Sequence, residues 1–201
     1  MKLLALAQRL WRALRWPVIV LAILFAGLVI ARIPAVTEQE RTALVVAEIQ
    51  SQRLTSEHVD GKHLPPPPDP SKADATVEGV DANMNGIRDD VELAIFEKYP
   101  NNLQLRAAEL QYAMALQTYL TKVFNTETWK AAAIQKSRAY ACISETYPRT
   151  NLETYLQVTK QRSDEVEMLV LNTDVRRHEL KAVDEFTTSY SLPSETLCDV
   201  K

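Results

Sequence analysis

Oxygen-bearing side chains recur at regular intervals in one segment of this 201-residue chain, residues 81–92. They occupy the first, third, fifth, ninth and twelfth positions of the segment and are Asp81, Asn83, Asn85, Asp89 and Glu92. Calcium is a hard cation that takes about six to eight oxygen ligands, so this alternation suits it. Gly86 permits a sharp turn at the sixth position, and the backbone carbonyl of Ile87 serves at the seventh. The spacing therefore predicts one Ca²⁺ site, to which these five side chains and the Ile87 carbonyl contribute.

The segment resembles the loop of the EF-hand, whose pattern of Asp, Asn, Gly and Glu positions it matches without a gap. Its core, Asn-Gly-Ile-Arg-Asp-Asp, is similar to thrombospondin type 3 repeats and to bacterial dockerin-type repeats. Together with Asp69-Pro70 upstream, the loop resembles a group of exported bacterial proteins of unassigned function that carry one such loop. The resemblance implies bound calcium; it covers little of the helical region and says nothing about an activity. The alternative interpretation is an Asn/Gly-rich turn followed by an Asp that caps the next helix.

Three features distinguish this loop from a paired EF-hand. Position 8, which is normally apolar, is Arg88; no second loop of this kind occurs; and residues 70–80 do not have the pattern of an entering helix. We expect Arg88 on the surface, with the carboxylate of a partner as its alternative contact. A solitary loop with only three carboxylates predicts weak binding, with a Kd on the order of 10⁻⁴–10⁻³ M. Its expected role is to stiffen a junction rather than to act as a switch.

An uncharged apolar run occupies residues 16–31 and predicts a membrane-spanning helix. The run is about 24 Å long at the helical rise, and residues up to Val36 extend it toward the roughly 30 Å of a hydrocarbon core. Basic residues before it predict a cytoplasmic N-terminus (1–15), a signal anchor (16–36) and a periplasmic remainder at the bacterial inner membrane. The alternative is a signal peptide cleaved near Ile33-Pro34-Ala35, which also exports the remainder.

Residues 37–80 are expected to form a helical stalk and a proline-rich linker. Thr37 to Glu40 has the pattern of a capping box, which predicts a helix from residue 38 to about residue 56. Pro65 to Pro68 exclude a helix or a central strand and favour polyproline II, a semi-rigid spacer. A proline-rich recognition ligand is the alternative function of this run.

Beyond the loop, apolar residues recur at intervals of three and four, the period of amphipathic helices. The chain holds only 4 glycines, which also favours helix. Short connections between the predicted helices favour antiparallel packing of neighbours. The sequence therefore predicts an all-α protein in which residues 81–201 form the loop and a small helical bundle.

Cys142 and Cys198 are the only cysteines, and both lie in the part predicted to be exported. An oxidising compartment favours a disulfide between them, with two unpaired thiols as the alternative. The absence of a Cys-x-x-Cys pair gives no support to a thiol oxidoreductase.

The charge distribution argues against a nucleic-acid-binding protein. Of the 23 basic residues, 18 follow residue 32 together with all 26 acidic residues, so the predicted exported part carries a net charge of −8. No recognised catalytic motif occurs, so no catalytic residue is assigned and an enzyme is not the favoured interpretation. Three hypotheses remain: an anchored calcium-binding protein whose bundle binds a protein partner, a calcium-responsive envelope regulator, and an enzyme whose site forms only in the fold.

Overall fold

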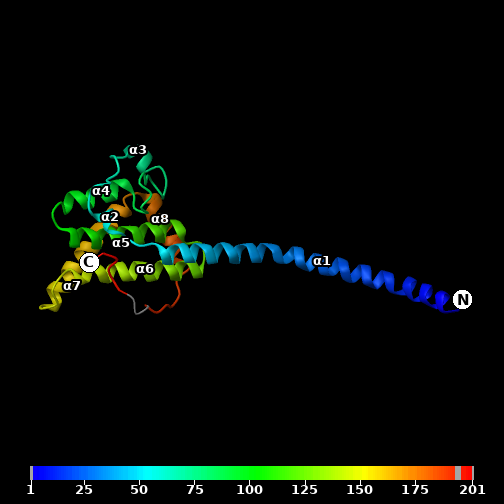
Figure 1. Cartoon of the computed structure of the whole chain (residues 1–201). Coiled ribbons are helices and arrows are strands. Elements are labelled where there is room, and N and C mark those ends of the chain that lie inside the picture. Colours follow the sequence, from blue (N-terminus) through cyan, green and yellow to red (C-terminus); the bar gives the residue numbers. More distant parts are fainter. Residues whose placement is uncertain (1, 193–195, 201) are drawn as a thin grey trace. The chain divides into compact units, whose positions relative to one another are not determined.

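The computed structural model describes residues 2–192 and 196–200, and over this range it contains α-helices and no β-strand (Figure 1), which confirms the all-α prediction. The helices are α1 (Lys2–Ser51), α2 (Ser56–Val59), α3 (Pro70–Ala73), α4 (Asp89–Lys98), α5 (Leu103–Lys122), α6 (Thr126–Glu145), α7 (Leu152–Val170) and α8 (Asp174–Asp184). The chain divides into two units, Met1–Leu44 and Val45–Lys201, so the boundary between them falls inside α1.

Helix α1 contains the apolar run of the sequence. Its portion Arg15–Ser51 is long and apolar enough to cross a membrane, and none of its most apolar stretch is buried within the protein. Large hydrophobic side chains such as Phe25, Leu28 and Ile30 are exposed on it. This helix is consistent with the predicted single-pass anchor, because exposed apolar side chains of this kind are stable in lipid.

The helix predicted to start at Thr37 does not start there, because the backbone before Thr37 is already helical. A capping residue must lie outside the helix to accept a hydrogen bond from the first free N–H groups. Thr37 Oγ1 instead donates to the carbonyl oxygens of Ile33 (3.2 Å) and Pro34 (2.9 Å). The helix also ends at Ser51 rather than near residue 56, so the predicted anchor and stalk are parts of one helix.

The segment expected to be a linker belongs to the second unit. Ile49, Leu54, Val59 and Ala73 are all buried in it, and Arg106 of α5 donates two hydrogen bonds to the Val59 carbonyl at 2.9 and 2.6 Å. The chain from Val45 onward is thus held against the bundle rather than serving as a spacer, because its apolar side chains gain more from burial than from exposure to water.

Helix α5 is the centre of the second unit and packs against α2, α4, α6, α7 and α8 (Figure 1). Every residue from Arg106 to Leu120 is buried. Small side chains let neighbouring helices approach from several sides, and the alanines of this stretch are Ala107, Ala108, Ala113 and Ala115. Short polar caps start the surrounding helices: Asn102, Asn125, Asn151 and Thr173 each accept a hydrogen bond from the backbone N–H three residues later.

Candidate metal centre

The loop of residues 81–92 leads from an irregular segment into helix α4, and two positive φ angles shape it. Gly86 has φ +84° and Met84 has φ 55°. A Cβ at Gly86 would lie 2.2 Å from the terminal nitrogen of the flexible Gln52 side chain, which could move, so it is the backbone conformation that requires glycine. These two residues turn the chain sharply enough for the first and last positions of the loop to approach each other.

Hydrogen bonds within the loop join its beginning to its end. Asp81 accepts from the backbone N–H groups of Asn85 (3.2 Å) and Gly86 (2.8 Å). Asp89 Oδ1 accepts from the Ala82 N–H at 3.0 Å. Glu92 Oε2 accepts from the Asn83 side-chain amide at 3.1 Å. The predicted ligands thus lie in one hydrogen-bonded loop that leads into the N-terminus of α4.

The sixth predicted contributor, Ile87, has its side chain in the hydrophobic core, where it is 1% exposed. Only its backbone is thus left for a ligand, which agrees with an apolar residue at this position. Its N–H donates to Asn85 Oδ1 at 2.8 Å. Among the described residues, no three His, Cys, Asp or Glu side chains lie close enough together to hold a metal ion by themselves. In the loop, the carboxylates accept hydrogen bonds from amide groups: Glu92 from the Asn83 side chain, Asp81 from the Gly86 N–H, and Asp89 from the Ala82 N–H.

Two carboxylates of the loop are almost completely removed from water: Asp89 is 1% exposed and Glu92 is 2% exposed. Burial raises the pKa of Glu92, and the negative charges of Asp89 and Asp81 raise it further. Burial is also the main cause that raises the pKa of Asp89. Asp89 Oδ2 and Asn85 Nδ2 are buried without a hydrogen-bond partner. An unpaired carboxylate oxygen in such a place fits a cation, since buried charges are stable only when paired or bound to a metal.

A buried carboxylate elsewhere in the bundle provides the contrast. Glu109 of α5 is 0% exposed and is neutralised by two cations, Lys98 Nζ at 3.0 Å and Arg162 Nε at 2.8 Å. The Tyr99 hydroxyl donates a further hydrogen bond to it at 2.7 Å. Within residues 2–192 and 196–200, neither Asp89 nor Glu92 forms such an ion pair. The fold therefore supplies counter-charge to its internal acid and not to those of the loop.

Arg88 lies inside the protein, so the surface position predicted for it is wrong. Its side chain is 0% exposed and donates to the carbonyls of Val170 (2.9 Å) and Leu169 (3.2 Å). It also pairs with Asp90 at 2.6 Å. The last carbonyls of α7 have no donor within their own helix, and a cation is favourable at a helix C-terminus. Arg88 thus attaches the loop to α7, at the position where a paired EF-hand would contact its second hand.

A second buried arginine, Arg176 of α8, fixes the segment that precedes the loop. Its side chain is 0% exposed and donates to the carbonyls of Ala73, Thr76 (2.9 Å) and Val77 (3.2 Å) and to Asp74 (3.0 Å). Gly79 is required beside it, because a Cβ there would lie 2.5 Å from the Arg88 side chain. No pattern in the sequence indicates this role, since Arg176 lies in the polar run Arg-Arg-His.

Comparison of the chain with protein-family models, with curated proteins and with solved structures finds no match. The function of the loop therefore has to be inferred from its own residues and geometry.

A cavity of about 110 Å³ opens beside the loop. Asn83, Asn85 and Glu92 line it together with His58 and His63. The His63 carbonyl also accepts a long hydrogen bond, 3.4 Å, from the Asn83 amide. The cavity's other lining residues are Glu57, Gly61, Leu64 and Phe96, so it lies between the loop and the segment that precedes it.

The two cysteines form the predicted disulfide, with their Cα atoms 4.9 Å apart. The bond joins Cys142 of α6 to Cys198 in the C-terminal segment, 56 residues away. Cys142 is 2% exposed and belongs to the hydrophobic core. The disulfide therefore holds residues 196–200 against the bundle, far in the sequence from the loop of residues 81–92.

Proposed function

We propose that this chain is a membrane-anchored calcium-binding protein whose loop 81–92 holds one structural Ca²⁺ ion. Asp81, Asn83, Asn85, Asp89 and Glu92 supply side-chain oxygens, and Ile87 supplies its carbonyl. When bound, the ion provides the positive charge that the fold does not otherwise place beside these carboxylates. The helical unit that carries the loop serves as an interaction domain for a protein partner, and α1 is the anchor in the bacterial inner membrane.

One observation carries the calcium proposal: two carboxylates are buried next to each other without a cation. Asp89 has an oxygen without any hydrogen-bond partner, and the charges that act on Glu92 are the like charges of Asp89 and Asp81. Leaving ionised groups buried in this way is costly. A divalent cation removes the cost at neutral pH, and the match of the spacing to a calcium loop favours calcium over other divalent ions.

The attachment of the loop favours a structural role over a switch. Arg88 binds the loop to the end of α7, and Arg176 binds the preceding segment to α8. A regulatory EF-hand changes the angle between two helices when calcium binds. Here the segment immediately before the loop contains only the four-residue helix α3. Buried hydrogen bonds of Arg88 and Arg176 hold the loop and that segment in place. Calcium would therefore rigidify this region.

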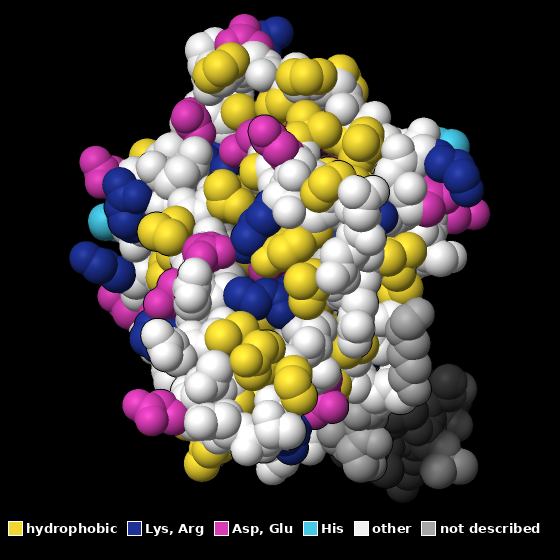
Figure 2. All heavy atoms as spheres, turned by 90° about the vertical axis from the view of Figure 1, so that its left-hand side faces the viewer, with side chains coloured by type: hydrophobic (Ala, Val, Ile, Leu, Met, Phe, Trp, Pro, Cys, Tyr) yellow, Lys and Arg dark blue, Asp and Glu magenta, His cyan; other side chains and the backbone are white. Residues whose placement is uncertain are grey.

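The proposed periplasmic side rests on the basic residues that precede the apolar run. The kind of partner is inferred from the side chains on the protein surface. Figure 2 shows acidic, basic and hydrophobic side chains interspersed over the face it presents, without a broad patch of one charge. Nucleic-acid binding requires a concentration of positive charge, so this face does not suit it. A mixed polar and apolar surface suits contact with another protein.

The primary test is calorimetric titration of the full-length protein in detergent with calcium. We expect one site with a Kd on the order of 10⁻⁴–10⁻³ M. The variant Asp81→Ala/Glu92→Ala should give no binding heat. In 10 mM calcium, occupancy of such a site stabilises the native state by about 1–3 kcal/mol. A parent protein whose melting temperature is the same with calcium and with chelator would refute the proposal, and a large change in helix content on titration would favour the regulator.

Glu92→Gln is expected to shift the melting temperature in opposite directions in the two conditions. In chelator it should raise the melting temperature, because it removes one of the mutually repelling buried charges. In 10 mM calcium it should lower the melting temperature, because an amide cannot replace the bidentate carboxylate. Glu97→Gln is the matched control, since Glu97 is an exposed carboxylate on the same helix α4. If the melting temperature fell in both chelator and calcium, Glu92 would be needed for the fold itself and not as a calcium ligand.

The stability of the chelated protein should depend on pH through the same residues. A carboxyl group whose pKa is raised by folding destabilises the native state above its folded-state pKa, and this effect vanishes below its ordinary pKa of 4.5 for Glu92 and 3.8 for Asp89. The gain in melting temperature from Glu92→Gln in chelator should therefore be largest at neutral pH and decline as the pH approaches 4.5. Melting curves of both proteins across this range measure it; a gain that does not change with pH contradicts the assignment.

The anchor is tested by fractionation and intact mass. We expect the full-length protein to remain with membranes after alkaline extraction, and to keep residues 1–36. A chain that lacks residues 2–36 should become soluble. A mature mass that begins after Ala35 would establish the cleaved signal peptide instead.

A further inference from the structure

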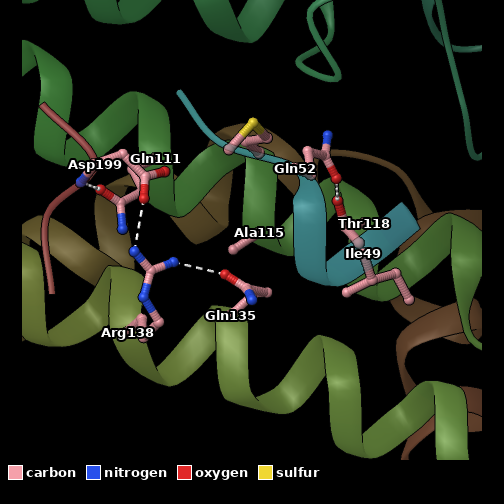
Figure 3. Close-up of a pocket in the computed structure, with 9 residues that line it drawn as sticks. Ile49, Gln52, Gln111, Ala115, Thr118, Gln135, Arg138 and Asp199 are labelled. Atoms are coloured by element: carbon pink, nitrogen blue, oxygen red, sulfur yellow. Dashed lines mark hydrogen bonds and ion pairs between the residues drawn. The ribbon is translucent and has the colours of Figure 1, made fainter. Parts of the chain in front are cut away.

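The C-terminal segment Thr196–Val200 lies in a polar groove between α5 and α6, and its acidic side chain is the most completely enclosed part. The Asp199 side chain is 2% exposed. Arg138 of α6 binds Asp199 Oδ1 at 2.6 Å (Figure 3). The Leu54 backbone N–H donates to Asp199 Oδ2 at 3.0 Å. Both carboxylate oxygens are thus bound by donors from elements distant in the sequence.

The groove also binds the backbone of the segment. Gln111 of α5 donates to the Leu197 carbonyl at 2.8 Å and accepts from the Asp199 N–H at 2.9 Å. Arg138 donates to the Thr196 carbonyl at 3.1 Å. Three backbone groups of the segment, which bends at Leu197 and at Asp199, are therefore recognised by one amide and one guanidinium. Contacts of this kind do not depend on the side chains of Thr196 and Leu197. Together, these contacts bind the Asp199 carboxylate and backbone groups of Thr196, Leu197 and Asp199.

The groove side chains stand on helices that pack through the core, so their positions do not depend on the segment alone. Gln111 is 2% exposed, Arg138 is 3% exposed, and Gln135 accepts from Arg138 at 2.6 Å (Figure 3). A cavity of about 10 Å³, room for about one water molecule, lies beside them. Without the segment, Arg138 would lose the carboxylate that neutralises it, and its guanidinium would be open to solvent. The vacated groove would therefore favour a peptide that offers a carboxylate to Arg138.

We propose that this groove is a binding site for an acidic peptide, that residues 196–200 are its resident occupant, and that the Cys142–Cys198 disulfide closes it. Reduction opens the site. The thiolate of a dithiol attacks the disulfide to give a mixed disulfide; its second thiol then displaces the protein sulfur. Cys142 and Cys198 end as thiols, and the dithiol ends oxidised by two electrons. A peptide whose carboxylate takes the place of Asp199 then competes with the resident segment. This site is independent of the calcium loop.

The test measures binding of a fluorescent peptide, Thr-Leu-Ser-Asp-Val amide, to the full-length protein by anisotropy. The oxidised protein should not bind it, and the variant Cys198→Ser/Asp199→Ala, whose own segment is weakened, should bind it. The peptide with Asn in place of Asp should bind at least about tenfold more weakly, because it loses charge-assisted hydrogen bonds to Arg138. Equal binding of both peptides, or no binding by a variant that keeps its helical circular dichroism and cooperative melting, overturns the proposal.

A trapping experiment covers the case in which that variant does not fold. The single variant Cys198→Ser leaves Cys142 as a free thiol and keeps Asp199. It is mixed with the disulfide-linked dimer of Thr-Leu-Cys-Asp-Val amide, so that Cys142 can form a mixed disulfide and release one peptide thiol. Mass spectrometry should show the adduct forming at least about tenfold faster than with the Asn peptide. Equal rates would mean that the groove does not recognise the carboxylate.

Discussion

Replacing Arg88 with methionine is expected to lower the free energy of unfolding by about 3–5 kcal/mol, the usual cost of removing one partner from a buried charged network. The change leaves the carbonyls of Leu169 and Val170 without their donor and Asp90 without its cation. For a unit of this size the melting temperature should fall by roughly 10 °C. Circular dichroism of the parent and the variant, in chelator and in calcium, measures the effect.

Arg177→Met is the matched control for this prediction. Arg177 also donates to a carbonyl at the end of α7, that of Leu171 at 2.6 Å, and pairs with Asp174, but its side chain is 50% exposed. An exposed pair contributes at most about 1 kcal/mol, so this variant should melt close to the parent. We also expect Arg88→Met to weaken calcium binding, because the loop loses its attachment. Equal effects of the two substitutions would show that Arg88 is not the attachment of the loop.

Replacing both cysteines with alanine is the second large expected effect. Loss of the Cys142–Cys198 bond should lower the free energy of unfolding by about 2–4 kcal/mol, because the unfolded chain regains the freedom of the closed segment. The buried contacts of Asp199 with Arg138 and Gln111 should keep the native state populated. Denaturant melts of the variant and of the oxidised parent compare the two stabilities.

Dithiothreitol separates the disulfide from the side effects of substitution. It should bring the melting point of the parent close to that of the double variant and leave the variant unchanged. A parent that is insensitive to reductant under conditions where mass spectrometry shows two free thiols would mean that the bond contributes nothing. That result would leave the ion pair of Asp199 and Arg138 as the main attachment of the C-terminal segment.

The proposed calcium loop has no second loop of its kind in the sequence to pack against, and the helical bundle supports it instead. The eighth position of a paired EF-hand loop contacts the second hand, whereas here Arg88 at this position donates hydrogen bonds to carbonyls of α7. Arg176 binds the segment before the loop. Both arginines reach carbonyls far from them in the chain: 82 residues separate Arg88 from Val170, and 103 separate Arg176 from Ala73. No pattern of neighbouring residues indicates contacts at such separations, which is why the surface position expected for Arg88 was wrong.

Short-range patterns were sufficient for several features. The alternation of oxygens around Gly86 is enough to predict a calcium loop, because the expected ligands and the turn lie within twelve consecutive residues, and calcium binding there stays a prediction. The apolar run identifies a helix long enough to span a membrane, since length and hydropathy are local properties. With only two cysteines, the predicted disulfide had one possible partner for each, and the structure contains it. The period of the apolar residues was likewise enough to predict an all-α fold.

The tertiary structure alone decided where these features end and what they touch. Thr37 has the sequence of a cap, but the helix before it continues, so the predicted stalk and anchor are one helix. Residues from Val45 onward join the bundle because Ile49, Leu54 and Val59 find a core to bury them. The groove for Asp199 is assembled from α5, α6 and the Leu54 backbone. The sequence predicts which residues of the loop could be ligands, because these residues are neighbours in the chain. Burial and counter-charge come from residues that only folding brings together, so only the fold shows which carboxylates are left without a cation.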